Sequence, residues 1–262
     1  QEEEDKEDCP ICCDALPKIS AQFTRLGCCG KGLHDKCYKD LLTNKSMTTE
    51  QKATCIMCRT KDNKEGSKED IEQLRGWVKK GKAWAMTTLA HRYSQGVGVK
   101  QSDKKTIELY EMAAKRGHAN AQYNLGVCYN GGILGLTQSS KTAIELYTLA
   151  ANQGHPDALY NLGQMYLSGE GIEQSDKKAI ELYEMAAKTG DAGAQYDLGL
   201  YYHQGIRGLT QSSKRAFEYY TLAANQGFAN AQYNLGFMYA IGEGIETSYS
   251  KARKWWTKAA AQ

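Results

Sequence analysis

The 262-residue chain lacks long apolar runs and lacks a surplus of either charge. No window approaches the roughly 18–20 continuous apolar residues that a membrane helix needs, so we expect no membrane partner. The formal net charge is +3, and neither half of the chain concentrates its basic residues. Because phosphate binding needs a concentrated basic face, the sequence also predicts no nucleic-acid partner.

The chain also has little that enzymes use for chemistry. Its five histidines are scattered, and although His118 and His155 occupy equivalent positions, Asp191 and Phe228 stand at the equivalent positions later on. We therefore expect surface histidines rather than a site. No glycine-rich loop precedes a predicted strand, so no phosphate cradle is expected. The sequence predicts no catalytic residue and no organic cofactor.

The cysteines are concentrated at one end. Eight of the nine lie between Cys9 and Cys58, and only Cys128 lies outside that span. A secreted disulfide scaffold would spread paired cysteines through its folded parts, whereas a cluster with Cys-x2-Cys spacing and a histidine is typical of zinc in a reducing compartment. We therefore expect a location in the cytoplasm or nucleus.

Eight residues of this cluster form an ordered set of candidate ligands: Cys9, Cys12, Cys28, Cys29, His34, Cys37, Cys55 and Cys58. Thiolates and an imidazole at these spacings suit tetrahedral zinc, and eight ligands make two closed sites. A domain of about 55 residues with few large apolar side chains needs such metal sites for its stability. Two structural zinc ions are thus expected, with no open position for metal catalysis.

The rest of the chain is an internal repeat. The hexapeptide that begins at Ala121 returns with at most one substitution at Ala158, Ala194 and Ala231, and a diverged copy begins at Ala85. The spacings are 36, 37, 36 and 37 residues. Such regularity is typical of a stacked array and not of an enzyme.

Each repeat is predicted to form two helices. The first helix carries an apolar stripe at helical spacing, made of Ala121, Leu125, Cys128 and Tyr129. A glycine in this helix, Gly126, allows a neighbouring helix to approach closely. The expected N-caps of the second helices are Ser140, Asp176 and Ser213, and the expected stops are Gly154, Gly190 and Gly227. Residues 69–81 align with a second helix alone and are expected to cap the array, whereas Trp255 and Trp256 are expected in the core of the last repeat.

These repeats resemble the Sel-type repeat (SLR) family, relatives of the tetratricopeptide repeats. A Leu-Gly-x-x-Tyr step, a Gly-x-Gly-Ile loop and a Tyr-x-x-Ala-Ala end recur in register over residues 83–262, with departures in the loops 131–135 and 205–208. The resemblance implies a right-handed superhelix whose concave face binds proteins or peptides.

The cysteine-rich segment resembles a RING finger, both around His34 to Leu42 and at the closing Cys55-Ile-Met-Cys58-Arg59. In that family alternate ligand pairs share a metal. The resemblance therefore implies one zinc on Cys9, Cys12, His34 and Cys37. It implies a second zinc on Cys28, Cys29, Cys55 and Cys58.

The segment departs from the family pattern at two positions. Lys31 stands where the fourth ligand is usual, so the adjacent Cys28 is taken as the replacement, with Cys13 as the competing thiol. Ile56 stands where the family commonly has proline. The resemblance also implies three contacts to a ubiquitin-conjugating enzyme: Ile11, Leu41 and Arg59. The guanidinium of Arg59 suits a residue that hydrogen-bonds both that enzyme and ubiquitin.

The expected fold is mainly α, an α-solenoid of five SLR repeats preceded by a small zinc-stabilised, RING-like cross-brace domain. The expected parts are an acidic disordered tail (1–8), the finger (9–62), a linker and capping helix (63–82) and repeats at 85–120, 121–157, 158–193, 194–230 and 231–262.

The expected function is a protein-binding scaffold that acts as a RING-type ubiquitin ligase, in which the solenoid recruits a client and the finger a conjugating enzyme. One alternative is a non-catalytic adaptor with a purely structural finger, which Lys31 and Ile56 favour. Another is a histone-reading PHD finger, which the adjacent Cys28 and Cys29 and the small Ala53 disfavour.

One repeat position points to the client groove, and its residues are Asn124, Asn161, Asp197 and Asn234. This position lies at the flank of the apolar stripe, away from Tyr129. A row of amides, each with two donors and an acceptor, would suit the backbone of an extended peptide. The alternative is that these side chains brace neighbouring repeats.

Overall fold

The computed structural model describes residues 23–25, 32–34 and 64–262 and divides the chain into two compact units, Gln1–Ser139 and Ser140–Gln262. The predicted acidic tail and most of the predicted finger lie outside the described residues. Within the described ranges, no helix is long and apolar enough to span a membrane.

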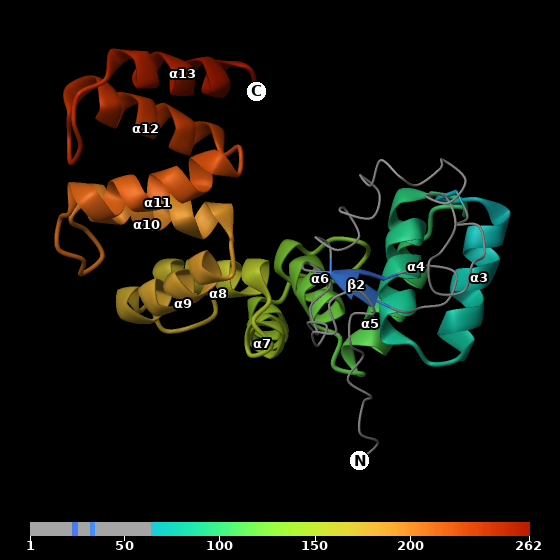
Figure 1. Ribbon diagram of the computed structural model, residues 1–262. Helices are drawn as coiled ribbons and strands as arrows, with labels where there is room; N and C mark the ends of the chain where they lie inside the picture. Colours follow the sequence, from blue (N-terminus) through green and yellow to red (C-terminus); the bar gives the residue numbers. More distant parts are fainter. Residues whose placement is uncertain (1–22, 26–31, 35–63) are drawn as a thin grey trace. The chain divides into compact units, whose positions relative to one another are not determined.

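The described part of the first unit holds a short β-ladder and four helices (Figure 1). Strand β1 (Phe23–Arg25) pairs antiparallel with β2 (Gly32–His34), so that Phe23 lies opposite His34. The helices are α3 (Lys68–Lys79), α4 (Ala83–Gln95), α5 (Asp103–Ala114) and α6 (Ala119–Gly131). Consecutive helices pack on one another, and α3 takes the place of a second helix before the first repeat.

The regular secondary structure of the second unit consists of helices alone. It contains α7 (Ser140–Ala151), α8 (Pro156–Ser168), α9 (Asp176–Lys188), α10 (Ala192–Gln204), α11 (Ser213–Asn225), α12 (Ala229–Ile241) and α13 (Tyr249–Ala260). Each helix packs on the next, so that α8/α9, α10/α11 and α12/α13 form three hairpins that follow one another (Figure 1). The two helices predicted for each repeat are confirmed.

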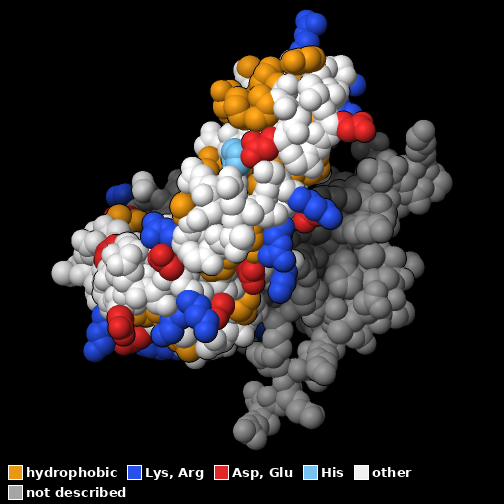
Figure 2. Space-filling view, turned by 90° about the vertical axis from the view of Figure 1, so that its left-hand side faces the viewer, with side chains coloured by type: hydrophobic (Ala, Val, Ile, Leu, Met, Phe, Trp, Pro, Cys, Tyr) orange, Lys and Arg blue, Asp and Glu red, His pale blue; other side chains and the backbone are white. Residues whose placement is uncertain are grey.

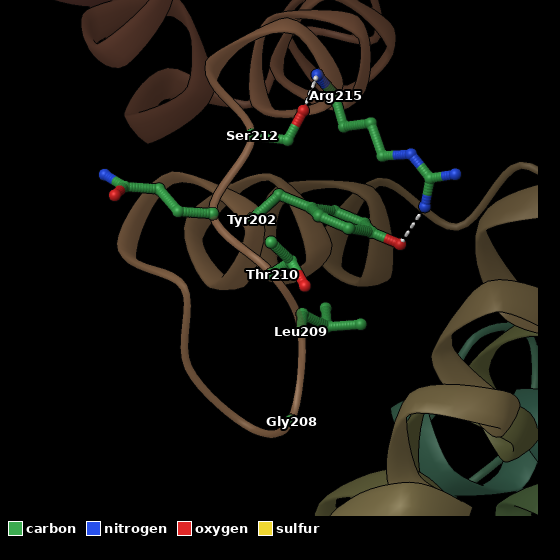
Figure 3. A pocket seen from close by; sticks show the side chains of 7 residues that line it. Tyr202, Gly208, Leu209, Thr210, Ser212 and Arg215 are labelled. Atoms are coloured by element: carbon green, nitrogen blue, oxygen red, sulfur yellow. Dashed lines mark hydrogen bonds between the residues drawn. The ribbon is translucent and has the colours of Figure 1, made fainter.

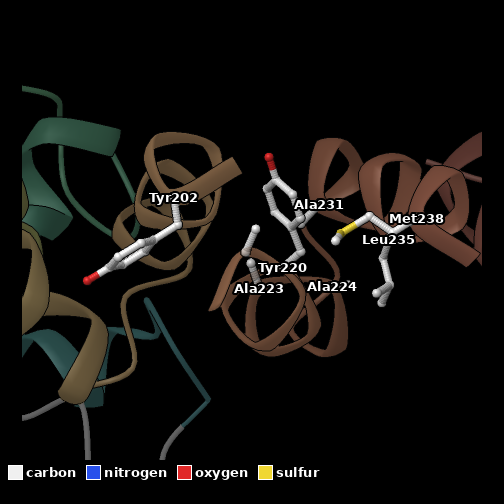
Figure 4. Packing of buried hydrophobic residues seen from close by; sticks show 8 residues of the cluster. Tyr202, Tyr220, Ala223, Ala224, Ala231, Leu235 and Met238 are labelled. Atoms are coloured by element: carbon white, nitrogen blue, oxygen red, sulfur yellow. The ribbon is translucent and has the colours of Figure 1, made fainter. Parts of the chain in front are cut away.

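Alanines and tyrosines form the core between these helices. Figure 4 shows one cluster, in which Tyr220 and two alanines of α11 meet Ala231, Leu235 and Met238 of α12. Tyr147, Tyr183 and Tyr220 occupy one repeat position, and each is at most 1% exposed. The repeated tyrosine is therefore the largest buried side chain of α7, α9 and α11.

A glycine on the facing helix makes room for that aromatic ring. A Cβ added to Gly199 would lie 2.6 Å from Tyr220 Cδ1, and one added to Gly163 would lie 2.7 Å from Tyr183 Cε1. In the last repeat Trp256 replaces the tyrosine, and a Cβ on Gly236 would lie 2.6 Å from its ring. The close approach predicted for this glycine position is thus confirmed in the second unit.

Trp256 differs from the prediction that it lies in the core. Its side chain is 36% exposed, although its Nε1 donates a hydrogen bond to the Tyr233 carbonyl at 3.2 Å. Trp255 is half-buried and packs against the cluster of Figure 4. Helix α13 packs on α12, where the Trp256 ring lies against Gly236, and the other side of the ring is uncovered.

The second helices begin one residue earlier than predicted. Ser102, Ser175, Ser212 and Ser248 are the N-caps, and each hydroxyl accepts a hydrogen bond from the backbone N–H three residues later. The predicted caps Asp176 and Ser213 are instead the first helical residues, as is Ser140. The preceding serine has the extended backbone that a cap needs, with φ −156° at Ser175.

Candidate functional site

The residues predicted to bind zinc and the conjugating enzyme are almost all beyond the described part of the chain. Of the eight predicted ligands only His34 falls within it, on β2. Ile11, Leu41 and Arg59 fall outside. Across the residues that are described, no group of His, Cys, Asp and Glu could hold a metal ion. Cys128 is buried in α6, and burial raises the pKa of its thiol to about 11, so it is a structural cysteine.

The predicted groove residues lie at equivalent places on the first helix of each repeat. Asn124 lies on α6 in the first unit, and Asn161, Asp197 and Asn234 lie on α8, α10 and α12 in the second. All four are half-buried. Within the described structure, the side chains of Asn124 and Asn161 form no hydrogen bond.

Asp197 differs from Asn124 and Asn161, because the first helix of the preceding repeat holds it. The Tyr160 hydroxyl of α8 donates to Asp197 Oδ2 at 3.0 Å, and Gln164 Nε2 donates to the same oxygen at 3.3 Å. These bonds join two consecutive repeats. At this position the bracing role applies, whereas the groove assignment of the asparagines remains a prediction.

Two more carboxylates lie on the same helices: Asp191 interacts with Asp197, and Asp157 interacts with Asp191. Burial raises the pKa of Asp157, Asp191 and Asp197, and Asp191 raises the pKa of Asp197 further by repulsion, whereas the Tyr160 hydrogen bond lowers it. The same burial raises the pKa of Tyr160, with Asp197 adding to the rise. The first-helix face of α8 and α10 is therefore acidic and half-buried.

His155 corrects the expectation that the histidines lie at the surface. It is 5% exposed and is the N-cap of α8, where its Nδ1 accepts a hydrogen bond from Ala158 N at 3.4 Å. Burial lowers the pKa of the imidazole to about 4, so the ring is neutral at pH 7. Asp191 has the same capping role at α10, which explains why the position accepts either residue.

Polar bonds between consecutive repeats form a second set of contacts that sequence reasoning missed. Ser140 Oγ donates to Glu170 at 2.7 Å, and the equivalent Ser213 Oγ donates to Glu243 at 2.8 Å. His203 Nε2 lies 3.1 Å from the other Glu243 oxygen. The Ser–Glu pair recurs 73 residues apart, so this arrangement is a repeated brace and not a catalytic group. The matching spacing of the serines and glutamates was the signal that could have revealed it.

A small hollow lies beside the α10/α11 hairpin. Its volume is about 420 Å³, and it lies between the loop at Gly208 to Ser212 and the ring of Tyr202 (Figure 3). Arg215 Nη1 donates to Tyr202 Oη at 2.6 Å, and its guanidinium lies 5.0 Å from the ring centre. A lysine covers the equivalent tyrosine in other repeats, as Lys178 covers Tyr166. The contact is thus part of the repeat, and the hollow contains no nucleophile paired with a base.

The end of the second unit that carries α12 and α13 exposes hydrophobic side chains (Figure 2). Tyr233, Phe237 and Ile241 are 59%, 43% and 54% exposed at successive turns of α12. The matching face of α8 is covered by the next repeat, where Tyr160 and Gln164 contact Asp197. The exposed face is therefore the surface that one repeat presents to the next.

Comparisons with known proteins agree with this geometry. The family model of the Sel1 repeat matches residues 85–118, 119–155, 156–191, 192–228 and 229–262. The structure of a Sel1 repeat protein from Oxalobacter formigenes is 31% identical, covers 74% of this chain with 76% of its own length and has a TM-score of 0.66. The family match begins at residue 85 and does not extend to the segment predicted to form the zinc finger.

Two further structures are similar in fold. The antigen c5321 of uropathogenic Escherichia coli, which displays an SLR fold, is 27% identical over 74% of this chain and 49% of its own, with a TM-score of 0.56. The immunity protein PA5088 from Pseudomonas aeruginosa is 19% identical over 94% of this chain and 85% of its own, with a TM-score of 0.51. No curated protein matches the chain.

Proposed function

Because this chain belongs to the Sel1 repeat family and is a protein-binding scaffold, we propose that it is a RING-type ubiquitin ligase whose repeats select the client. The observation that carries the proposal is that one chain combines eight Cys and His residues at zinc-finger spacing with five Sel1 repeats. The repeats bind protein, and the finger brings a conjugating enzyme to it.

The first-helix row of α8, α10 and α12 is the proposed client surface. Asn161 has a half-buried side-chain amide with no hydrogen bond to another described residue, and Asp197 Oδ2 accepts hydrogen bonds from Tyr160 and Gln164. Amides and carboxylates at one spacing can pair with the peptide groups of an extended client segment. The buried carboxylates favour a segment that also carries a cation, because an unpaired buried charge is unfavourable.

The finger would hold two zinc ions in a cross-brace. The donor set of seven thiolates and one imidazole suits closed tetrahedral zinc, and it needs no ligand from the repeats. The zinc ions would supply folding free energy and no chemistry. Ile11 and Leu41 would contact the conjugating enzyme, and Arg59 would hydrogen-bond both that enzyme and ubiquitin.

The proposed mechanism is positional. The finger supplies no nucleophile. The conjugating enzyme carries ubiquitin as a thioester, and a lysine of the client attacks that thioester. The finger would hold that thioester in one reactive geometry, which raises the rate because orientation removes an entropic part of the barrier. The repeats would raise the local concentration of the client at the thioester.

Autoubiquitination of the full chain against a panel of conjugating enzymes tests the ligase proposal. Wild type is expected to form ubiquitin conjugates with at least one enzyme. Ile11→Ala and Arg59→Ala are each expected to abolish the conjugates while the zinc content stays unchanged, and Lys177→Ala on α9 serves as a surface control. A wild-type chain that matches the no-protein control across the panel would establish the adaptor, which Lys31 and Ile56 favour.

A further inference from the structure

Helix α13 differs in charge from every second helix before it. The position of Glu108, Glu145, Glu181 and Glu218 is Lys254 in the last repeat. The position of Met112, Leu149, Met185 and Leu222 is Lys258. The position of Ile107, Ile144, Ile180 and Phe217 is Arg253. With Lys251, α13 carries four cations and no acidic residue.

These cations surround an aromatic hollow. A hollow of about 590 Å³ lies along α13 and is lined by Lys251, Arg253, Lys254, Trp255 and Lys258, together with Ser250 and Thr257. Lys258 Nζ lies 4.1 Å from the centre of the Trp255 ring, and all four cations are exposed. Among the described residues none of the four forms an ion pair.

We propose that the outer face of α13 binds an acidic segment of a partner protein that carries an apolar side chain. Carboxylates of the segment would pair with Lys254, Lys258 and Arg253, and its apolar side chain would lie against Trp255. The complementarity is specific to α13, because the equivalent surfaces of α9 and α11 present Glu181 and Glu218. This surface is separate from the row of Asn161 and Asp197 and needs no ligase activity.

A nucleic acid fits this surface less well. Proteins that bind a phosphate backbone neutralise roughly 6–10 phosphates along a path, whereas α13 offers four cations on one short helix. The neighbouring second helices interrupt any longer path with their glutamates. The apolar floor supplied by Trp255 also suits a side chain of a peptide.

Fluorescence anisotropy with the full chain tests the proposal. The probe is a fluorescein-labelled peptide of sequence Glu-Glu-Asp-Leu-Glu-Asp-Glu, with Ser in place of Leu as the first comparison and a single-stranded DNA of equal charge as the second. Wild type is expected to bind the leucine peptide about tenfold more tightly than either comparison, with affinity that falls as salt is raised. Equal or tighter binding of the DNA would overturn the choice of partner.

Two double variants with equal changes of charge locate the surface. Lys254→Glu with Lys258→Glu is expected to weaken binding of the leucine peptide about tenfold or more, since both charges are reversed. Lys177→Glu with Lys214→Glu, on α9 and α11, changes the net charge by the same amount. This second variant is expected to weaken binding of the peptide by less than about twofold. Because Lys254 already stands where other repeats have glutamate, the first variant is compatible with the fold, and its circular dichroism confirms this. Equal losses in both variants, or no binding by wild type, would overturn the proposal.

Discussion

At the scale of single residues, buried polar side chains connect one repeat to the next. Gln195 Nε2 donates to the Ala187 carbonyl at 3.0 Å, and Gln232 Nε2 donates to the Ala224 carbonyl at 3.1 Å. Both glutamines are 4% exposed, and both satisfy a carbonyl near the end of the preceding helix, where intrahelical partners run out. The glutamine of the repeated hexapeptide is thus a helix-end partner, a role that its sequence position alone does not reveal.

Asp197 and Asn161 are expected to respond differently to truncation. Asp197→Ala removes the acceptor of Tyr160 and Gln164, so it is expected to lower the free energy of unfolding by about 1–2 kcal/mol. Asn124→Ala with Asn161→Ala removes no bond within the described structure, so stability is expected to change by less than about 0.5 kcal/mol while client capture falls. Urea denaturation followed by circular dichroism measures both. A large loss of stability in the double variant with client capture intact would show that the asparagines brace the repeats.

His155 is expected to make the repeats less stable in acid. Its folded pKa of about 4 lies below the ordinary value of 6.5, so between these values the unfolded chain binds more protons. The stability that the neutral ring contributes is therefore present above pH 6.5 and falls, by up to about 3 kcal/mol, as the pH drops toward 4. The raised pKa values of Asp157, Asp191 and Asp197 act in the opposite direction, because these groups gain stability as they become protonated.

The variant His155→Asn isolates this effect, because asparagine can cap the helix but does not titrate. Melting temperatures of wild type and variant are expected to converge as pH falls from 7 to 4.5. Parallel pH profiles for wild type and His155→Asn would contradict the buried neutral histidine.

At the scale of helices, the hairpin depends on a glycine facing a tyrosine. Adding a methyl group at Gly199 would force the Tyr220 ring or the helix to move. Gly199→Ala is therefore expected to lower the free energy of unfolding by about 1–3 kcal/mol, despite the better helix propensity of alanine.

Gly76 provides the matched control for this substitution. It lies within α3, and an added Cβ would meet nothing within 4 Å. Gly76→Ala is therefore expected to raise stability by about 0.5–1 kcal/mol through helix propensity alone. Thermal and urea denaturation of the two variants measure the contrast. A Gly199→Ala chain as stable as Gly76→Ala would mean that the hairpin tolerates a wider spacing than the structure has.

The positions of most helices could be predicted from the sequence, because the same short pattern recurs in register. The apolar stripe at Ala121 and Leu125 reports a local rule that holds in every repeat, and the stop at Gly154 recurs as Gly117, Gly190 and Gly227. Contacts between repeats are harder to predict, because they depend on which side of one helix meets the next. The Tyr160–Asp197 bond joins residues 37 apart, and the burial of His155 depends on neighbours that no local pattern specifies.

At the scale of the whole molecule, we propose that a client-binding array is joined to a zinc finger. Metal analysis of the purified full chain is expected to return two zinc ions. Cys28→Ser is expected to lose one of them and Cys13→Ser none, because Cys28 completes the second site in the proposed cross-brace. Loss of one zinc ion in Cys13→Ser but not in Cys28→Ser would identify Cys13 as the ligand. A purified chain without zinc would contradict the proposed finger.

Transfer of ubiquitin to a captured protein tests whether the repeats and the finger act together. Wild type is immobilised, incubated with cell extract, ubiquitin and a matching conjugating enzyme, and the bound proteins are analysed for ubiquitin-modified lysines. The account predicts that at least one captured protein is modified. Arg59→Ala should abolish the modification but not the capture, and Asn124→Ala with Asn161→Ala should abolish both. A captured protein that stays unmodified by a wild-type chain active in autoubiquitination, or one whose modification survives Arg59→Ala, would contradict the account.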